Sequence, residues 1–165
     1  EITSAVRISM ARNAISEVPE TILSLQKLSH LNLHGNVLKS LPKTINQLRA
    51  LRFLTVADNR LTDLPQGFGS CPSLVYLDLS CNLLAEITPH FGYLTTLRTL
   101  HLGSNALREL PPQIGNLTAL TTLGLRDNKL ARLPPEIGQL TRLENLLIQG
   151  NKIRLFPKTL VQCEL

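Results

Sequence analysis

The apolar residues of this chain recur in a fixed order with a period of 23 residues. From Leu28 to Leu48 the order is LxxLxLxxNxLxxLPxxIxxL, and it returns from Leu51 to Cys71. An asparagine marks the same place in every period, at positions 13, 36, 59, 82, 105, 128 and 151. Such a period is typical of a repeat protein. We expect a single domain over residues 1–165, with seven units that begin at residues 5, 28, 51, 74, 97, 120 and 143.

Each unit is expected to hold one strand and one short return turn. The LxLxx part alternates apolar and polar residues, as a strand with one buried face does. After the asparagine the apolar residues come about every three positions, which predicts a 3₁₀ or short α-helical turn. Proline stands at the fifteenth position of most units, where its missing N–H is no loss to a starting turn. In Ile87-Thr88-Pro89 the proline is displaced by one position.

The predicted fold is an α/β solenoid of horseshoe shape. One unit alone cannot bury its leucines, and stacking joins the leucine columns of all units into one core. We expect a parallel β-sheet on the concave face and the wider 3₁₀ or α turns on the convex face. The asparagines fall where each strand bends, and a side-chain amide can bond the backbone groups that a bend leaves unpaired. We interpret that column as structural.

The 23-residue unit with its LPxxIxxL return segment resembles the intracellular leucine-rich-repeat proteins over the whole chain. The stretches LPPQIGNLTAL (110–120) and LPPEIGQLTRLENLLIQGN (133–151) are similar to the Ras suppressor family and, more loosely, to Shoc2-type and Scribble-type scaffolds. The resemblance implies an adaptor in cell adhesion or Ras signalling. It also implies a LIM-domain protein or another Ras-pathway protein as the partner.

Composition narrows the class of protein further. A chain of 165 residues with 43% hydrophobic residues can bury a core without disulfides. It lacks the run of about 18 apolar residues that a membrane-spanning helix needs, and its start does not read as a secretory signal. The three cysteines are few and odd in number, so we expect a reducing, cytoplasmic setting. Cys71 and Cys163 stand at a leucine position and are predicted core residues, whereas Cys81 is predicted to be partly exposed.

The outward-facing positions of the strands are the candidate binding surface. Alternate residues of a half-buried strand share a face, so the third, fifth and seventh positions of each unit are predicted to line the concave surface. Phe53 and Tyr76 fall on neighbouring strands there, as an aromatic anchor with a polar rim would. Alternatively, the two rings only stack on each other as a cross-strand pair. The predicted partner-binding residues are Arg7, His30, Asn32, His34, Phe53, Thr55, Tyr76, Asp78, Thr99, His101, Thr122, Arg126 and Asn145.

The same surface offers little for catalysis or metal binding. His30 and His34 with Asp58 or Asp78 have zinc-binding side chains, but the two histidines lie too far apart along a strand to share an ion. The serines and histidines occupy different strands without a buried acid to orient a base, and no glycine-rich phosphate loop occurs. We predict no enzyme activity, no cofactor and no metal. We predict no nucleic-acid partner either, since the repeats offer no helix for a groove and the basic residues lack interleaved aromatics.

The chain has 17 basic and 12 acidic residues, a net charge of +5. Basic residues are expected on the loops that leave the strands: Lys39, Arg60, Arg108, Lys129, Arg132, Lys152 and Arg154. Glu17, Asp63, Glu86 and Glu109 interrupt them in the first five units, while the last two units hold seven basic against four acidic residues. The simpler interpretation is a solvated edge. The other is a docking surface for an acidic partner, whose binding would weaken as salt rises.

The predicted function is a non-catalytic protein–protein interaction scaffold or adaptor that binds a partner on the concave face. A rigid surface loses little ordering entropy when it binds. The alternative is the substrate-recognition arm of a larger multidomain enzyme, such as a kinase, GTPase or ubiquitin ligase. A third interpretation is a fragment of an extracellular receptor. The length of the native reading frame would separate the first two.

Overall fold

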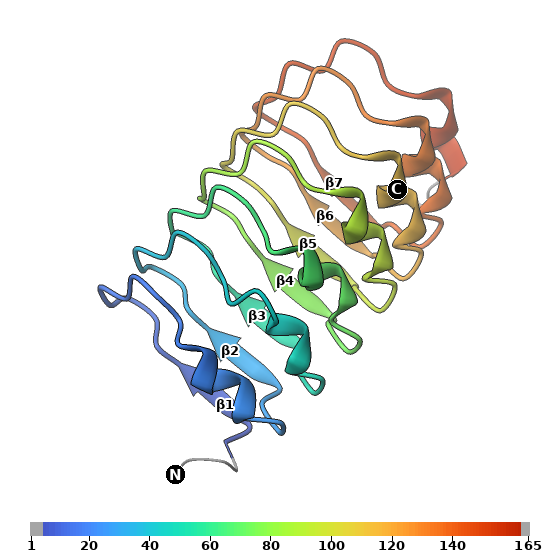
Figure 1. Ribbon diagram of the computed structural model, residues 1–165. Helices are drawn as coiled ribbons and strands as arrows, with labels where there is room; N and C mark the ends of the chain where they lie inside the picture. The colour runs from blue at the N-terminus through green and yellow to red at the C-terminus, as the bar shows by residue number, and fades with distance from the viewer. Residues whose placement is uncertain (1–4, 163–165) are drawn as a thin grey trace.

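A computed structural model describes residues 5–162 and contains one strand and one 3₁₀ turn in each unit (Figure 1). The strands are β1 (Arg7–Ser9), β2 (His30–Asn32), β3 (Phe53–Thr55), β4 (Tyr76–Asp78), β5 (Thr99–His101), β6 (Thr122–Gly124) and β7 (Asn145–Leu147). The turns are η1 (Glu20–Ser24), η2 (Ile45–Gln47), η3 (Gln66–Ser70), η4 (Pro89–Tyr93), η5 (Pro112–Asn116), η6 (Pro135–Gln139) and η7 (Lys158–Gln162).

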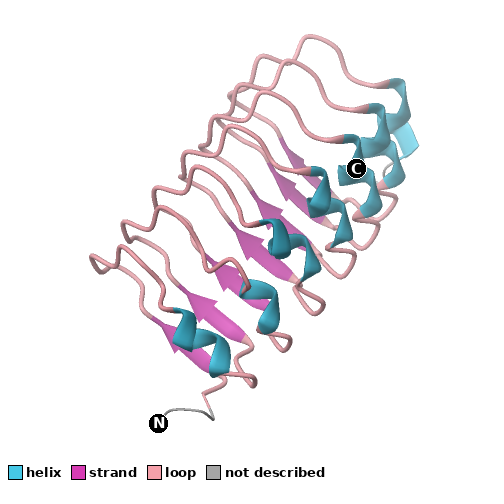
Figure 2. Cartoon of the chain, in the orientation of Figure 1, coloured by secondary structure: helices cyan, strands magenta, loops and turns pink. Residues whose placement is uncertain are grey.

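The strands form one parallel sheet in chain order, and the turns form a second layer beside it (Figure 2). Equivalent positions of successive units lie directly opposite each other, so that His30 pairs with Phe53 and Phe53 with Tyr76. This arrangement confirms the predicted solenoid, with the sheet on the concave side and the turns on the convex side. The register also places each third-position side chain beside the equivalent side chains of the neighbouring units.

The strands are shorter than the alternating pattern suggests. Each covers only the third to fifth positions of its unit. The eighth residue of every unit has a positive φ, between 52° and 73°, in the series Arg12, Gly35, Asp58, Cys81, Ser104, Asp127 and Gly150. This left-handed residue turns the chain away from the sheet. The seventh position therefore lies beyond the strand's end, and Ala57, expected on the surface, is buried.

The core is a set of aliphatic columns that runs the length of the stack. Within the fourth unit, for example, Leu74, Leu77, Leu79 and Leu84 are completely buried. Cys71 occupies a leucine column as predicted, and burial raises the pKa of its thiol to about 12. Cys81 is exposed, whereas Cys163 lies outside the described residues. Within residues 5–162, the inward side of strands β2 to β6 is formed by buried leucines.

The asparagines form a continuous hydrogen-bonded column beside these leucines. The Asn59 amide donates to the carbonyls of Leu33, Val56 and Ala57 at 3.0, 3.1 and 3.2 Å, and its Oδ1 accepts from the Leu38 N–H at 3.0 Å. The Leu33 carbonyl also accepts from Asn36, so each such carbonyl joins two successive units. The structural interpretation of this column is confirmed.

The convex turns η3 to η6 begin from the same extended conformation whether or not proline is present, whereas η2 begins from Thr44 with φ −107° and ψ 31°. Pro65, Pro111 and Pro134 precede their turns with φ between −67° and −61° and ψ near 146°. Thr88 takes their place in the fourth unit with φ −77° and ψ 157°, and Pro89 becomes the first residue of η4. The displaced proline therefore leaves the path of the chain unchanged.

Candidate functional site

Four rings form a continuous ladder on the outer face of the sheet. The centroids of His30 and Phe53 are 4.3 Å apart with 12° between the ring planes, and those of Phe53 and Tyr76 are 6.3 Å apart with 29°. The ladder then steps diagonally to His101, whose ring meets Tyr76 edge-on at 5.9 Å. We call these four side chains the ring ladder. It crosses strands β2 to β5.

Positive charge flanks the first end of the ladder. The Arg52 guanidinium carbon lies 5.9 Å from the Phe53 centroid, within the range of a cation–π contact. The Ser29 hydroxyl and the His30 Nδ1 are 2.7 Å apart. Partial burial, followed by the positive charges of Arg7 and Arg52, lowers the pKa of His30. The neutral imidazole is therefore favoured, which suits a flat stacking surface.

Negative charge lies at the middle of the ladder. Asp78 is two residues along β4 from Tyr76, and its Oδ1 accepts a hydrogen bond from the Ser80 N–H at 3.0 Å. Burial and, next, the Asp78 carboxylate raise the pKa of the Tyr76 hydroxyl. Tyr76 thus keeps its proton and can donate a hydrogen bond to a partner.

A glycine on the next strand makes room for the far end of the ladder. A Cβ placed on Gly124 would lie 2.6 Å from the His101 Nδ1, so the imidazole covers this glycine. Any larger residue at Gly124 would force His101 to move. The position of the fourth ring therefore depends on the absence of a side chain at Gly124.

The remaining predicted residues share the face but lie outside the ladder. Thr99, Thr122 and Asn145 continue the third-position column toward the C-terminal end, and Asn32 and Thr55 lie at the strands' fifth positions. The Asn32 Oδ1 accepts from the backbone N–H of His34 at 3.0 Å. Arg126, beyond the end of β6, donates from Nε to the Gln149 Oε1 at 2.7 Å.

Two contributors to the ladder were not predicted. Arg52 precedes β3 and so falls outside the alternating outward positions, although an arginine directly before a predicted aromatic is a usable signal. Gly124 stood in the predicted fifth-position column as a residue with no side chain to contribute. Its role becomes visible only when the neighbouring His101 is placed.

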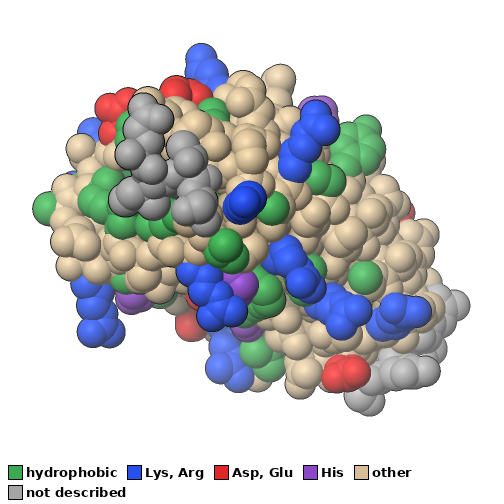
Figure 3. All heavy atoms as spheres, turned by 90° about the horizontal axis from the view of Figure 1, so that it is seen from below, with side chains coloured by type: hydrophobic (Ala, Val, Ile, Leu, Met, Phe, Trp, Pro, Cys, Tyr) green, Lys and Arg blue, Asp and Glu red, His purple; other side chains and the backbone are tan. Residues whose placement is uncertain are grey.

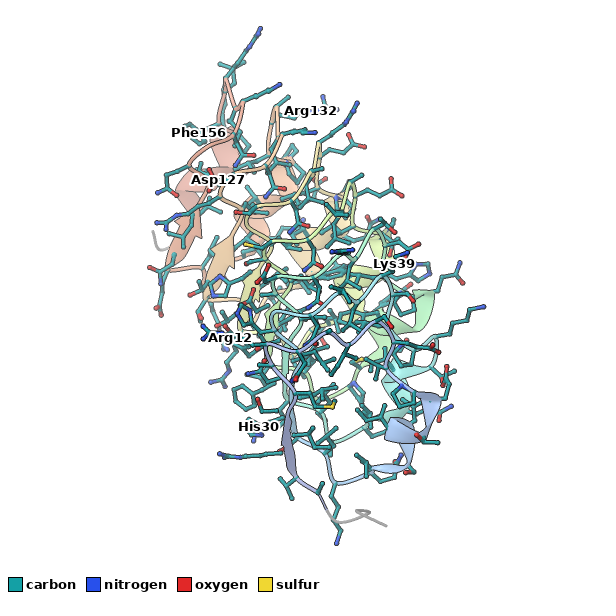
Figure 4. The ribbon with its side chains drawn as sticks, turned by 90° about the vertical axis from the view of Figure 1, so that its left-hand side faces the viewer. Arg12, His30, Lys39, Asp127, Arg132 and Phe156 are labelled. Carbon is teal, nitrogen blue, oxygen red and sulfur yellow. The ribbon has the colours of Figure 1, made fainter. Side chains whose placement is uncertain are left out.

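Basic residues follow both edges of the sheet. The loops that leave the strands carry Arg12, Lys39 and Arg132 on the side that faces the viewer in Figure 4, and acidic residues are interspersed among them. Figure 3 views the stack from below, where Lys and Arg side chains form an open row. The described loops between a turn and the next strand contain Lys27, Arg49, Arg52, Arg98 and Arg142 against one acidic residue, Glu144. Docking of an acidic partner stays a prediction.

Residues 5–162 contain no group of three or more His, Cys, Asp or Glu side chains placed to hold a metal ion. In the same part of the chain, no helix has the length and apolar character that crossing a bilayer requires. The outer face of the sheet offers aromatic stacking, hydrogen bonds and a few charges.

Comparison with known families identifies the class of protein. The family model described as "Leucine-rich repeat region" matches residues 7–104 and 77–163. The chain belongs to the leucine-rich-repeat family, whose members generally mediate protein–protein interactions. No curated protein sequence matches it.

Solved structures with the same fold include longer proteins. A leucine-rich-repeat protein of Leptospira interrogans, LIC12759, is 36% identical with a TM-score of 0.89, over 91% of this chain and 38% of its own. A TDR receptor is 26% identical with a TM-score of 0.85, over 95% of this chain and 28% of its own. An internalin of Listeria monocytogenes, InlF, is 24% identical with a TM-score of 0.81, over 94% of this chain and 44% of its own. The chain thus spans less than half the length of each.

Proposed function

We propose that this chain is a non-catalytic interaction module that holds a partner protein against the ring ladder. The observation that carries the proposal is the ladder itself: four rings in contact on the outer face of a sheet whose inner face is aliphatic. Aromatic side chains supply much of the binding energy at protein interfaces. Because the ladder is held by paired strands, a partner would meet a preformed surface.

A purely stabilising role for the rings accounts for less of the arrangement. Cross-strand aromatic pairs stabilise a sheet by roughly 0.2–1 kcal/mol, and the pair of Phe53 and Tyr76 alone would supply that. The ladder continues past this pair to an imidazole at each end, and it carries Arg52 on one side and Asp78 on the other. Such an apolar centre with mixed charge around it resembles the core and rim of an interface.

The finer proposal is an intracellular adaptor in Ras signalling or cell adhesion, with a LIM-domain or Ras-pathway protein as its partner. Its support is the similarity of residues 110–120 and 133–151 to the Ras suppressor family. The cytoplasmic setting belongs to the same proposal, and the exposed thiol of Cys81 suits a reducing compartment.

A second candidate function is partner recognition within a larger enzyme. The observation that favours it is length, since the matched structures extend well beyond the segment that this chain covers. In that case the ring ladder would hold a substrate for a catalytic domain elsewhere in the protein. A native reading frame with several hundred flanking residues supports this candidate, and one with a few tens supports the adaptor.

The test is capture of proteins from a lysate of the source organism, compared by quantitative mass spectrometry. The variant Phe53→Ser/Tyr76→Ser removes the middle of the ladder, and Tyr93→Ser removes an exposed ring from the convex turn η4 as a matched control. Proteins that wild type and the Tyr93 variant retain should be lost from the double variant. Equal retention by all three would refute the proposal.

A further inference from the structure

A groove lies on the loop edge of the last four units, away from the ring ladder. Its volume is about 820 Å³, and it runs along the segments that connect each strand to the next 3₁₀ turn. Ile87, Leu110 and Leu133 form its buried floor, and Phe156 and Leu155 extend it at 60% and 79% exposure. Figure 4 labels Phe156 and Arg132 at this end of the stack.

The walls of the groove are rigid and poor in hydrogen-bond donors. Two consecutive prolines line it in each of two units, as Pro111-Pro112 and Pro134-Pro135. Proline has no N–H and a fixed φ, so these segments offer no backbone donor to a ligand and do not adjust on binding. The carbonyls of Pro111 and Pro134 already accept from the N–H groups of Ile114 and Ile137 within their own turns. A ligand for this surface must bring its own donors.

The charge of the groove is opposite to that of the whole chain. Its lining contains Glu86, Glu109 and Glu136 against the single cation Arg132, whereas the chain carries +5. No ion pair joins these four side chains within residues 5–162. A negative strip on a basic protein attracts cationic ligands over the surrounding surface.

Glu136 is the residue of the groove that would pair with a cation. The Glu136 Oε2 is buried, and no group of the described chain donates a hydrogen bond to it. A buried acceptor without a donor is costly, and a charged acceptor more so. A guanidinium or ammonium group in the groove would supply the opposite charge, and it would also supply the missing donor once the carboxylate rotates toward it.

We propose that this groove binds an extended, basic and apolar peptide segment of another protein. Four units are separated by three steps of about 5 Å, so the ends of the groove lie roughly 15 Å apart. About five residues of an extended peptide cover this distance. An Arg or Lys of the segment pairs with Glu136, and an apolar residue covers Phe156 and Leu155. Glu109 adds to the attraction from the preceding unit. This site is independent of the ring ladder.

The test uses the whole chain and fluorescent octapeptides composed of Arg, Leu, Phe and Pro, with a second set that carries citrulline in place of Arg. Citrulline keeps the shape of arginine and removes its charge. Fluorescence anisotropy should show at least tenfold tighter binding of the arginine set, and this preference should decrease as salt rises. Absence of a preference for the arginine set would overturn the proposal.

Variants locate the binding. Glu109→Gln/Glu136→Gln should weaken binding of the arginine peptides at least tenfold without lowering the Tm, because the buried oxygen at Glu136 loses its charge. Asp63→Asn, at the position equivalent to Glu86 and Glu109 in an earlier unit, is the matched control and should bind as wild type does. Loss of binding in Phe53→Ser/Tyr76→Ser would place the peptides on the concave face and overturn the proposal. Sedimentation tests whether a second copy of the chain occupies the groove instead. A dimer that the arginine peptides do not dissociate would also overturn the proposal.

Discussion

The ninth and the third positions of the unit both repeat regularly along the stack, but they differ in residue type and in the contacts that their side chains make. The ninth is asparagine in all seven units, and from Asn36 onward each one bonds its own unit and the one before. The third holds a different side chain in nearly every unit, on strands in perfect register. From Asn36 onward the asparagine side chains are buried or half-buried, whereas the third-position side chains lie on the outer face of the sheet.

This difference shows that the asparagine column stabilises the fold, whereas the third-position column is free to serve partner binding. A buried amide that bonds carbonyls in two units can be replaced by almost nothing else, since each loss leaves backbone groups without partners. An outward side chain on the same backbone can vary freely, because no neighbouring unit depends on it. The repeat therefore supplies a fixed set of positions, and the ring ladder is one particular use of them.

The largest expected effect is a loss of stability when one asparagine of the ninth-position column is replaced. Asn59→Ala leaves the buried Leu38 N–H without its acceptor and the Leu33 carbonyl with one donor fewer. We expect the free energy of unfolding to fall by about 3 kcal/mol, which denaturant unfolding would measure. Asn13→Ala is the control, because Asn13 is exposed at the first unit and should cost less than about 1 kcal/mol. Equal losses in the two variants would contradict the role assigned to the column.

A smaller effect should follow from moving one ring without removing it. Gly124→Ala forces the His101 imidazole away from its present position, while Gly103→Ala adds a Cβ on the same face whose nearest atom is 3.4 Å away. We expect the first to weaken partner capture severalfold with a loss of stability below about 1 kcal/mol, and the second to change neither. Wild-type capture by Gly124→Ala would exclude His101 from the binding surface.

The smallest effect is a pH dependence at the other end of the ladder. The pKa of His30 is lowered from 6.5 in the folded chain, so the unfolded chain binds the extra proton first as the pH falls. The contribution of His30 to stability is therefore complete above pH 6.5 and decreases below it. Between about pH 7.5 and about pH 5, wild type should lose more Tm than His30→Gln does.

The same shift can be followed directly by NMR titration of the His30 ring. In Arg7→Gln/Arg52→Gln its pKa should rise part of the way toward 6.5, because burial is the larger cause and remains. An unchanged pKa would show that the two arginines do not act on this ring.

The 23-residue period made the fold predictable. Features at positions where the residue type varies between units could not be predicted. Leucine and asparagine stand at the same positions in unit after unit, so their spacing alone assigns the strand, the turn and the inward face. It does not assign the left-handed eighth position, because Gly35 and Gly150 share that position with Arg12, Asp58 and Cys81. The residue type at the eighth position therefore does not predict its left-handed backbone conformation.

The candidate site was predictable as a set of positions but not as a contact. Strand alternation placed Phe53, Tyr76 and the histidines on one face. The diagonal step from Tyr76 to His101 depends on the space above Gly124, and the cation–π contact depends on where the Arg52 side chain lies. The groove was missed because Leu110 and Leu133 fit the core pattern, which does not show the hollow above them.

The central claim is that the outer face can be changed without disturbing the column that builds the fold. The most direct measurement is denaturant unfolding of Phe53→Ser/Tyr76→Ser beside Asn59→Ala. The ring variant should keep its free energy of unfolding within about 1 kcal/mol of wild type, whereas the asparagine variant should lose about 3 kcal/mol. A ring variant that loses as much stability as the asparagine variant would contradict the account, since the ladder would then be part of the framework.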